Sequence, residues 1–276
     1  MVDIRNLSFG YQKNRLLFDD LNLHLPMGKI YGLLGKNGAG KTTLLKHIAG
    51  LLYPQMGDCL VFEQPSCDRL PEVLRDVYLI PEEFQLPAIK MDLFVKLHAP
   101  FYPNFDAEWF QKCLQEFEIN RNEKLSSLSY GQKKKFLIAF GLATRTRLLI
   151  MDEPTNGLDI PSKSQFRRII AASMTDERSI IISTHQVRDL SSLIDHVIIL
   201  DSGRVVFHQS TLDISSKLAF IQTKDVESLY VLHREDVLGG HAVICRQDGR
   251  ETEIDLELLF NGVVTHGEKV NNEFKI

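Results

Sequence analysis

The fold is decided by the stretch Gly35-Lys36-Asn37-Gly38-Ala39-Gly40-Lys41-Thr42, which satisfies the phosphate-loop pattern GxxxxGK[ST]. The apolar run IYGLL precedes it and the helix-like TTLLKHIAG follows it, which is the strand–loop–helix context that such a loop needs. Glycines let successive backbone N–H groups and a helix N-terminus face a phosphate. Lys41 is placed to reach the terminal phosphates, and the Thr42 hydroxyl to meet Mg²⁺. The stretch, with Thr43 after it, therefore predicts a bound nucleoside triphosphate.

A second apolar run, residues 148–153, ends in two carboxylates, Asp152 and Glu153. Parallel α/β sheets present their ligands at such strand ends. We expect Asp152 to hold the Mg²⁺ shell and Glu153 to accept a hydrogen bond from the attacking water as general base. Alone, the pair would favour a structural acidic turn, but together with the phosphate loop it predicts hydrolysis.

Short apolar runs bounded by turn residues recur along the chain and predict buried strands. These runs are Lys29–Leu34, Asp58–Phe62, Val77–Ile80, Leu148–Met151, Ser179–Ser183 and Val197–Leu200. Helix-like stretches lie between several of them: Lys41–Leu51, Gly131–Ala143 and Pro161–Ala172. The alternation predicts an α/β fold with a largely parallel sheet flanked by helices.

Three segments depart from that alternation. The N-terminal segment up to Pro26 alternates leucines with polar residues and predicts antiparallel strands. Residues 83–127 carry helix-like apolar spacing and predict an inserted helical subdomain. From residue 212 to 276 the composition changes again, which predicts a small α+β appendage after a main domain of residues 1–211. Within this tail, His233, His241 and His266 are not at the spacing of metal ligands.

Composition limits the function classes. The 276 residues are 44% hydrophobic and 25% charged, as in ordinary globular proteins. A net charge of -4 provides no general field that would attract nucleic acid or anionic lipid. The chain shows no signal peptide and no apolar run near the roughly 20 residues that span a bilayer. We expect a cytoplasmic protein that depends on another chain for any membrane span.

The pentapeptide Leu128-Ser129-Tyr130-Gly131-Gln132 precedes Asp152 and opens a helix-like run, with Ser129 as a candidate N-cap. It resembles the LSGGQ signature of ABC ATPases. The resemblance implies that Ser129, Gly131 and Gln132 bind the γ-phosphate of ATP held by the opposite subunit, as anions bind at helix ends. A plain capped helix is the alternative for this pentapeptide alone.

Three further matches have the order expected of the ABC family. Residues 157–159, Gly-Leu-Asp, resemble the D-loop at the subunit interface, so Asp159 is a candidate contact. His185 resembles the switch histidine, which would bond the γ-phosphate and orient the water. Tyr11 resembles the aromatic residue that stacks on adenine, with packing as its alternative role.

Two positions depart from the family pattern. Glu82 stands where a glutamine is usual, so an acid replaces the amide that senses Mg²⁺, water and the membrane partner; direct metal contact and no contact remain equally open. Tyr130 replaces a signature glycine, while Ser129 and Gly131 retain the groups that a phosphate needs. After the signature, Lys133, Lys134 and Lys135 favour a solvated helix start over a nucleic-acid patch.

The resemblance covers about residues 2–208. Within the family, the sequence is most similar to ATP-binding subunits of bacterial ABC-2-type exporters. The resemblance implies a Mg²⁺-dependent ATPase with ATP as ligand, working as a homodimer on the cytoplasmic face of a membrane with an integral membrane permease. The alternatives are a non-transport ABC ATPase acting on nucleic acid or ribosomes, a P-loop kinase and an inactive regulatory module. Retained Glu153 and His185 oppose the inactive module, and no direct nucleic-acid contact is expected.

Overall fold

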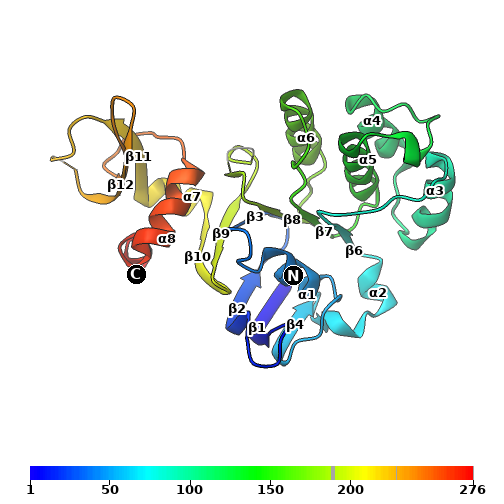
Figure 1. The fold of residues 1–276 in the computed structure, drawn as a ribbon, viewed down its shortest axis with the longest axis horizontal. Coiled ribbons are helices and arrows are strands. Elements are labelled where there is room, and N and C mark those ends of the chain that lie inside the picture. Colours follow the sequence, from blue (N-terminus) through cyan, green and yellow to red (C-terminus); the bar gives the residue numbers. More distant parts are fainter. Residues whose placement is uncertain (188–189, 228, 276) are drawn as a thin grey trace.

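The computed structural model describes residues 1–187, 190–227 and 229–275. In it, the strands form three sheets, and β3 of the central sheet lies in sequence between β2 and β4 of the N-terminal sheet (Figure 1). An antiparallel sheet has the order β2-β1-β4-β5, a central six-stranded sheet the order β10-β9-β3-β8-β7-β6, and a C-terminal sheet the order β11-β13-β12. Five neighbouring strands of the central sheet are parallel, and β10 closes its edge antiparallel to β9. The prediction of a largely parallel α/β sheet is therefore confirmed.

The strands have the bounds β1 Val2–Phe9, β2 Phe18–Leu25, β3 Ile30–Leu34, β4 Met56–Val61, β5 Gln64–Pro65, β6 Val77–Ile80, β7 Leu148–Asp152, β8 Ser179–Thr184, β9 His196–Asp201, β10 Arg204–Ser210, β11 Leu218–Thr223, β12 Val231–Val237 and β13 Gly240–Arg246. The α-helices are α1 Lys41–Ile48, α2 Pro71–Leu74, α3 Met91–His98, α4 Ala107–Glu116, α5 Tyr130–Ala143, α6 Ile160–Ala172, α7 Thr211–Lys217 and α8 Leu256–Asn272. Short 3₁₀ turns lie at Ser66–Asp68, Ala99–Phe101 and Leu125–Ser127.

The central sheet is buried on both faces, which explains why its strands are continuous apolar runs rather than alternating ones. Successive side chains point to opposite faces. In β7, Leu149 and Met151 join a core with the large helices, whereas Leu148 and Ile150 join a core with α1 and the N-terminal sheet. The carboxyl ends of β3, β7 and β8 are thereby held side by side between two packed layers.

The N-terminal sheet confirms the antiparallel prediction, since β1 pairs with β2 and β4 in antiparallel register. The predicted strand over Asp58–Phe62 begins earlier, at Met56, and belongs to this sheet. Its only deeply buried side chains are Cys59 and Val61, because the other face of β4 meets solvent.

Helices α3 and α4 lie within the predicted helical insertion, and α4 packs against α5 (Figure 1). Their shared core is rich in phenylalanine: Phe94, Phe105, Phe110 and Phe136 all lie against Phe140 or one another. At the other end of α5, the buried Arg178 guanidinium donates to the carbonyls of Gly141 and Leu142 at 3.2 and 3.1 Å. These donations satisfy carbonyls that a helix C-terminus leaves unpaired.

The last 60 or so residues form the three-stranded sheet β11–β13 with α7 and α8, an α+β arrangement of the predicted kind. Helix α8 packs on β10 and β12, and Asn271 Nδ2 donates to the Val206 carbonyl at 3.0 Å. Leu256, Leu259 and Val263 of α8 belong to the same buried cluster as the central sheet. The appendage is therefore seated on the edge of the main sheet.

Two of the tail histidines lie together although they are far apart in sequence, since His233 Nδ1 and His266 Nδ1 are 3.0 Å apart. His233 Nε2 also lies 3.1 Å from Glu235 Oε1. No group of three or more His, Cys, Asp or Glu side chains fit for a metal ion occurs among the residues that the structure describes. Within that same part of the chain, no helix has the length and apolarity to cross a membrane.

Candidate functional site

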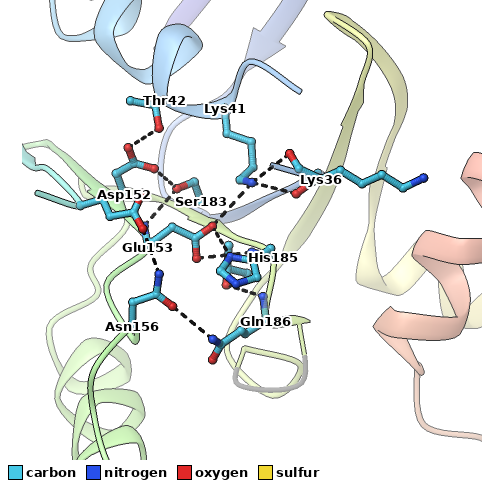
Figure 2. Close-up of polar contacts among 12 residues, drawn as sticks. Lys36, Lys41, Thr42, Asp152, Glu153, Asn156, Ser183, His185 and Gln186 are labelled. Carbon is cyan, nitrogen blue, oxygen red and sulfur yellow. Dashed lines mark hydrogen bonds and ion pairs between the residues drawn. The ribbon is translucent and has the colours of Figure 1, made fainter. Parts of the chain in front are cut away.

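The end of β7 and the start of α1 meet in a partly buried polar contact (Figure 2). The Thr42 hydroxyl donates to Asp152 Oδ2 at 2.6 Å, and the Ser183 hydroxyl donates to Asp152 Oδ1. Asp152 is only 2% exposed, so both of its oxygens are held by hydroxyl groups in a largely dry environment. Hydroxyl and carboxylate oxygens are the ligands that Mg²⁺ prefers, and their convergence fits the predicted metal site.

The phosphate loop is closed around the Lys41 ammonium. Its Nζ donates to the Gly35 carbonyl at 2.7 Å and lies 3.6 Å from Glu153 Oε1. Glycine is required at two positions of the loop: a Cβ on Gly35 would lie 2.6 Å from the Leu200 carbonyl, and Gly40 has a φ of +108°. The loop thus keeps a tight turn at the N-terminus of α1, where backbone N–H groups attract anions.

Glu153 and His185, the predicted hydrolytic pair, lie side by side (Figure 2). His185 Nδ1 lies 2.8 Å from Glu153 Oε1, although the residues are 32 positions apart. The Glu153 backbone has a φ of +45°, an uncommon conformation for a residue with a side chain. Its N–H donates to the Ser183 hydroxyl at 3.1 Å, which helps to hold that conformation.

Lys134 differs from the prediction of a solvated helix start, because its side chain is fully buried. Its Nζ donates to the Glu153 carbonyl at 3.0 Å and to the Glu82 carbonyl at 3.2 Å. It also lies over the rings of Phe84 and Tyr130. Burial lowers the pKa of Lys134, while nearby carboxylates, first Glu82, oppose that decrease. The reason for the error is that Lys134 lies on the one face of this turn that Phe84 and Tyr130 cover, while Lys133 and Lys135 stay partly exposed.

Glu82 begins a chain of side-chain hydrogen bonds that runs away from the metal position. Asn156 Nδ2 donates to Glu82 Oε1 at 3.0 Å, and Gln186 Nε2 donates to Asn156 Oδ1 at 3.2 Å. Lys163 Nζ then donates to Gln186 Oε1 at 3.1 Å. Glu82 still faces the pocket that contains Thr42, so a metal contact by its second carboxylate oxygen remains a prediction.

Tyr130, the residue that replaces a signature glycine, packs within its own chain. Its hydroxyl donates to the Glu82 carbonyl at 3.0 Å, and its ring stacks on Phe84 with centroids 5.4 Å apart. A Cβ on Gly157 would lie only 3.0 Å from the Tyr130 ring. The substituted ring therefore joins the Glu82 segment to the segment that resembles a D-loop.

One pocket of about 450 Å³ collects most of the predicted ligand residues. Its lining includes Tyr11, Lys36, Asn37, Gly38, Gly40, Lys41, Thr42, Thr43, Glu82, Asp152 and Glu153. Tyr11 is 64% exposed, and its hydroxyl lies 3.2 Å from Thr43 Oγ1. An exposed ring tethered at the mouth of a phosphate pocket is available for stacking on a base, which remains a prediction.

Ser129, Gly131 and Gln132 lie elsewhere, at the start of α5. Ser129 is the helix N-cap as predicted: its hydroxyl accepts from the Gln132 N–H at 3.2 Å, and Gln132 Oε1 accepts from the Ser129 N–H at 2.9 Å. Asp159 caps α6 in the same way through the Ser162 N–H at 2.9 Å. Among the described residues that line the phosphate pocket, none comes from 129–132 or from Asp159. These caps therefore add no wall to the phosphate pocket of their own chain.

Four residues of the site were not singled out from the sequence: Lys134, Asn156, Ser183 and Gln186. Ser183 carried a usable signal, because it ends a buried strand next to His185 in a position where polar residues meet ligands. Asn156 and Gln186 lie in turns after Glu153 and His185, where polar residues are common. Lys134 carried none, since lysine is almost never fully buried.

A glycine-rich loop at a helix N-terminus, a hydroxyl and a carboxylate meeting at a metal position, and a buried glutamate beside a histidine define a P-loop nucleoside triphosphatase. The family model described as "ABC transporter" matches residues 18–156. The chain is 28% identical over 205 residues to the ABC transporter ATP-binding protein YtrB of Bacillus subtilis (strain 168), covering 74% of this chain and 70% of YtrB.

A second relative is the SkfA peptide export ATP-binding protein SkfE of the same organism, 31% identical over 212 residues, covering 75% of this chain and 87% of SkfE. In structure, the chain resembles a dimeric ATP-binding cassette in a post-hydrolysis state with ADP and Pi, with a TM-score of 0.67 and 23% identity over 76% of this chain and 98% of that one.

The chain belongs to the ABC transporter family. It is an ATP-binding subunit of an ABC transporter, an ATPase that uses ATP with Mg²⁺. ABC ATPase domains work as dimers and with membrane permeases, so a second ATPase domain and a membrane-spanning chain are the classes of partner involved.

Proposed function

We propose that this chain is one of two identical ATPase subunits that bind two ATP molecules between them and drive export through a membrane-spanning partner. The observation that carries the two-subunit site is the separation of Ser129 from the phosphate pocket of its own chain. The capped start of α5 presents N–H groups and a hydroxyl that are suited to a phosphate. In the dimer, that helix end faces the γ-phosphate held by the phosphate loop of the other copy.

The residues around one phosphate pocket divide the work of hydrolysis. Lys41 and the N–H groups of residues 36–43 hold the phosphates, and Tyr11 stacks on the adenine ring. Glu153 accepts a proton from the attacking water, and His185 keeps both that carboxylate and the γ-phosphate in place. Gln132 and Asp159 act by fixing the helix ends that face the other copy.

Thr42, Asp152 and Glu82 fit the position of Mg²⁺. Thr42 and Asp152 already lie within hydrogen-bond distance, and Glu82 shares their pocket. When bound, Mg²⁺ neutralises charge on the phosphates. The Ser183 hydroxyl orients the Asp152 side chain by donating a hydrogen bond to it, so the carboxyl group is in position before nucleotide arrives.

A groove beside β6 is the feature that supports docking of a membrane partner. It has a volume of about 580 Å³ and is lined by apolar side chains that include Leu51, Leu79 and Phe101, with Arg69 and Arg75 among them. Phe101 is 70% exposed, which is unusual for a phenylalanine without a partner. We propose that it receives a cytoplasmic segment of the permease with apolar and acidic side chains. Strand β6 connects this groove to Glu82, which lies two residues beyond the end of the strand, so a movement of the permease would reach Glu82 through β6.

Export as the direction of transport follows the named relative, a peptide export ATP-binding protein. A subunit that takes ATP from the cytoplasm and binds a permease lies on the cytoplasmic face of the membrane. The test is to express the tagged chain in its own organism, solubilise the membranes and identify what co-purifies. A multi-span membrane protein supports the proposal, whereas ribosomes or DNA in its place would overturn it.

The matched control is the same purification with Phe101→Asp. That change places a charge in the groove far from the phosphate pocket, so it should release the membrane protein while ATP binding persists. Equal recovery of the membrane protein with both forms would show that this groove is not the docking site.

A further inference from the structure

The first two turns of α8 face the phosphate loop across a pocket for which hydrolysis within one copy has no use. A pocket of about 560 Å³ lies between them, lined by Gly35, Lys36, His185, Gln186, Val187, Glu257, Phe260 and Asn261. Figure 2 shows the Lys36 side chain extending from the loop toward the side where the faint red helix α8 lies. The appendage thus supplies one wall of the space outside the γ-phosphate position.

The position of this wall is fixed by the core. Leu256, Leu258 and Leu259 are buried in the main apolar cluster, and Phe260 is half-buried against it. Moving α8 away from the phosphate loop would expose these buried leucine side chains to water, which is unfavourable. The start of α8 therefore stays beside the phosphate loop as long as the appendage is packed on the central sheet.

The start of α5 and the turn before α6 form one continuous face of the chain. A Cβ on Gly131 would lie 3.1 Å from the Gly157 carbonyl, so the two segments are in contact. At the edge of this face, Ile160 is 85% exposed, and Lys133 and Lys135 lie on the same helix start as Ser129. Any second copy that brings Ser129 to the γ-phosphate brings this whole face with it.

We propose that the start of α8 is part of the interface with that second copy, receiving its Ser129–Ile160 face in the pocket beside Lys36. This inference rests on the two-subunit site proposed above. Polarity agrees, because Val187 and Phe260 offer apolar contact to the exposed Ile160 of the second copy. The appendage then stabilises the ATP-bound dimer, and by the two-fold symmetry does so twice.

The opposite role for the same wall would be obstruction, in which α8 keeps the second copy away. The two roles predict opposite effects of a charge at Phe260. Within an interface, an unpaired buried carboxylate weakens association, by about tenfold or more. If the wall obstructed docking, loosening it would strengthen association.

The experiment uses the full chain carrying Glu153→Gln, so that ATP is bound and not hydrolysed. Dimer formation is measured against protein concentration by light scattering with ATP and Mg²⁺, for this parent, for Phe260→Asp and for the control Thr265→Asp. Thr265 is exposed on the same helix outside the pocket. Phe260→Asp should raise the dimer dissociation constant at least about tenfold, while Thr265→Asp leaves it unchanged.

A second measurement guards against misfolding of Phe260→Asp. In a Cys67→Ser parent, whose other cysteines are buried, Asn261→Cys and Ile160→Cys are combined and mildly oxidised. An ATP-dependent disulfide between copies supports the interface. If ATP-bound dimers form without crosslinking, or if Phe260→Asp tightens the dimer, the α8 interface is overturned and the two-subunit site is not. If the parent stays monomeric with ATP, both proposals are overturned.

Discussion

The ammonium of Lys134 lies 3.0 Å from the Glu153 carbonyl and 3.2 Å from the Glu82 carbonyl, so one buried side chain joins Glu153, the proposed general base, to the segment after β6. Burying an ammonium is costly unless its donors are satisfied. Here two carbonyls satisfy two of them, and the rings of Phe84 and Tyr130 enclose the rest of the group. The geometry makes Lys134 a positioning residue for Glu153, whose left-handed backbone requires outside support.

We expect Lys134→Met to lower kcat for ATP hydrolysis about tenfold or more, because the lost hydrogen bonds release the Glu153 carbonyl and the Glu82 segment together. The apparent affinity for ATP should stay within about threefold, since the phosphate contacts come from the other side of the pocket. Phosphate release and binding of a fluorescent ATP analogue measure the two quantities separately.

Lys135→Met is the matched control for that change. Lys135 occupies the next position of α5 and lies over Phe117, away from Glu153. It should hydrolyse ATP like the parent, and Lys134→Arg should recover part of the activity. A parallel loss of ATP affinity and kcat in Lys134→Met would instead indicate general collapse of the site.

For Glu82, the prediction concerns the metal. Glu82→Gln preserves an oxygen for the Asn156 amide but removes one negative charge from the pocket that holds Asp152. A charge worth about 1 kcal/mol near the metal position should raise the Mg²⁺ concentration for half-maximal activity about threefold to tenfold. Titrating Mg²⁺ at saturating ATP tests it. An unchanged Mg²⁺ requirement would remove Glu82 from the metal site.

His185→Ala should separate binding from hydrolysis. Its ring lies 2.8 Å from the Glu153 carboxylate, so removal leaves the base without its partner. We expect a decrease in kcat of about 10²- to 10⁴-fold, the range typical of general acid–base groups. ATP should still drive the subunits together, because the phosphate loop and Ser129 are intact. Activity within a factor of a few of the parent would exclude His185 from the chemistry.

Much of this architecture could be predicted from the sequence because local patterns determine it. The phosphate loop, the acidic end of β7 and the N-cap Ser129 are each contained in a few consecutive residues, whose backbone chemistry is the same in any context. The parallel sheet could be predicted from continuous apolar runs, because a strand that is buried on both faces is apolar at successive positions.

The rest depended on which elements pack together. Lys134 is buried because Phe84 and Tyr130 close over it, and the three residues are brought together only by the tertiary fold. The same holds for the wall that Phe260 presents to Lys36, since more than 200 residues separate them in the chain. The exact strand partner of β4 also depended on this assembly, because an apolar run predicts a strand and not the sheet it joins.

The last prediction concerns stability and pH. His47, on α1 beneath the phosphate loop, is fully buried against Phe9 and Phe18, and burial lowers its pKa to about 4. The pKa of a histidine in an unfolded chain is near 6.5. Between pH 6.5 and about pH 4, His47 is therefore protonated in the unfolded chain and neutral in the folded chain. His47 therefore costs no stability above about pH 6.5 and destabilises the fold as pH falls below it, by at most about 1.4 kcal/mol per unit. His47→Leu should flatten the fall in urea midpoint between pH 6.5 and 5, whereas the same change at the exposed His24 should not. Parallel pH curves for His47→Leu and the parent would show that other groups govern acid stability.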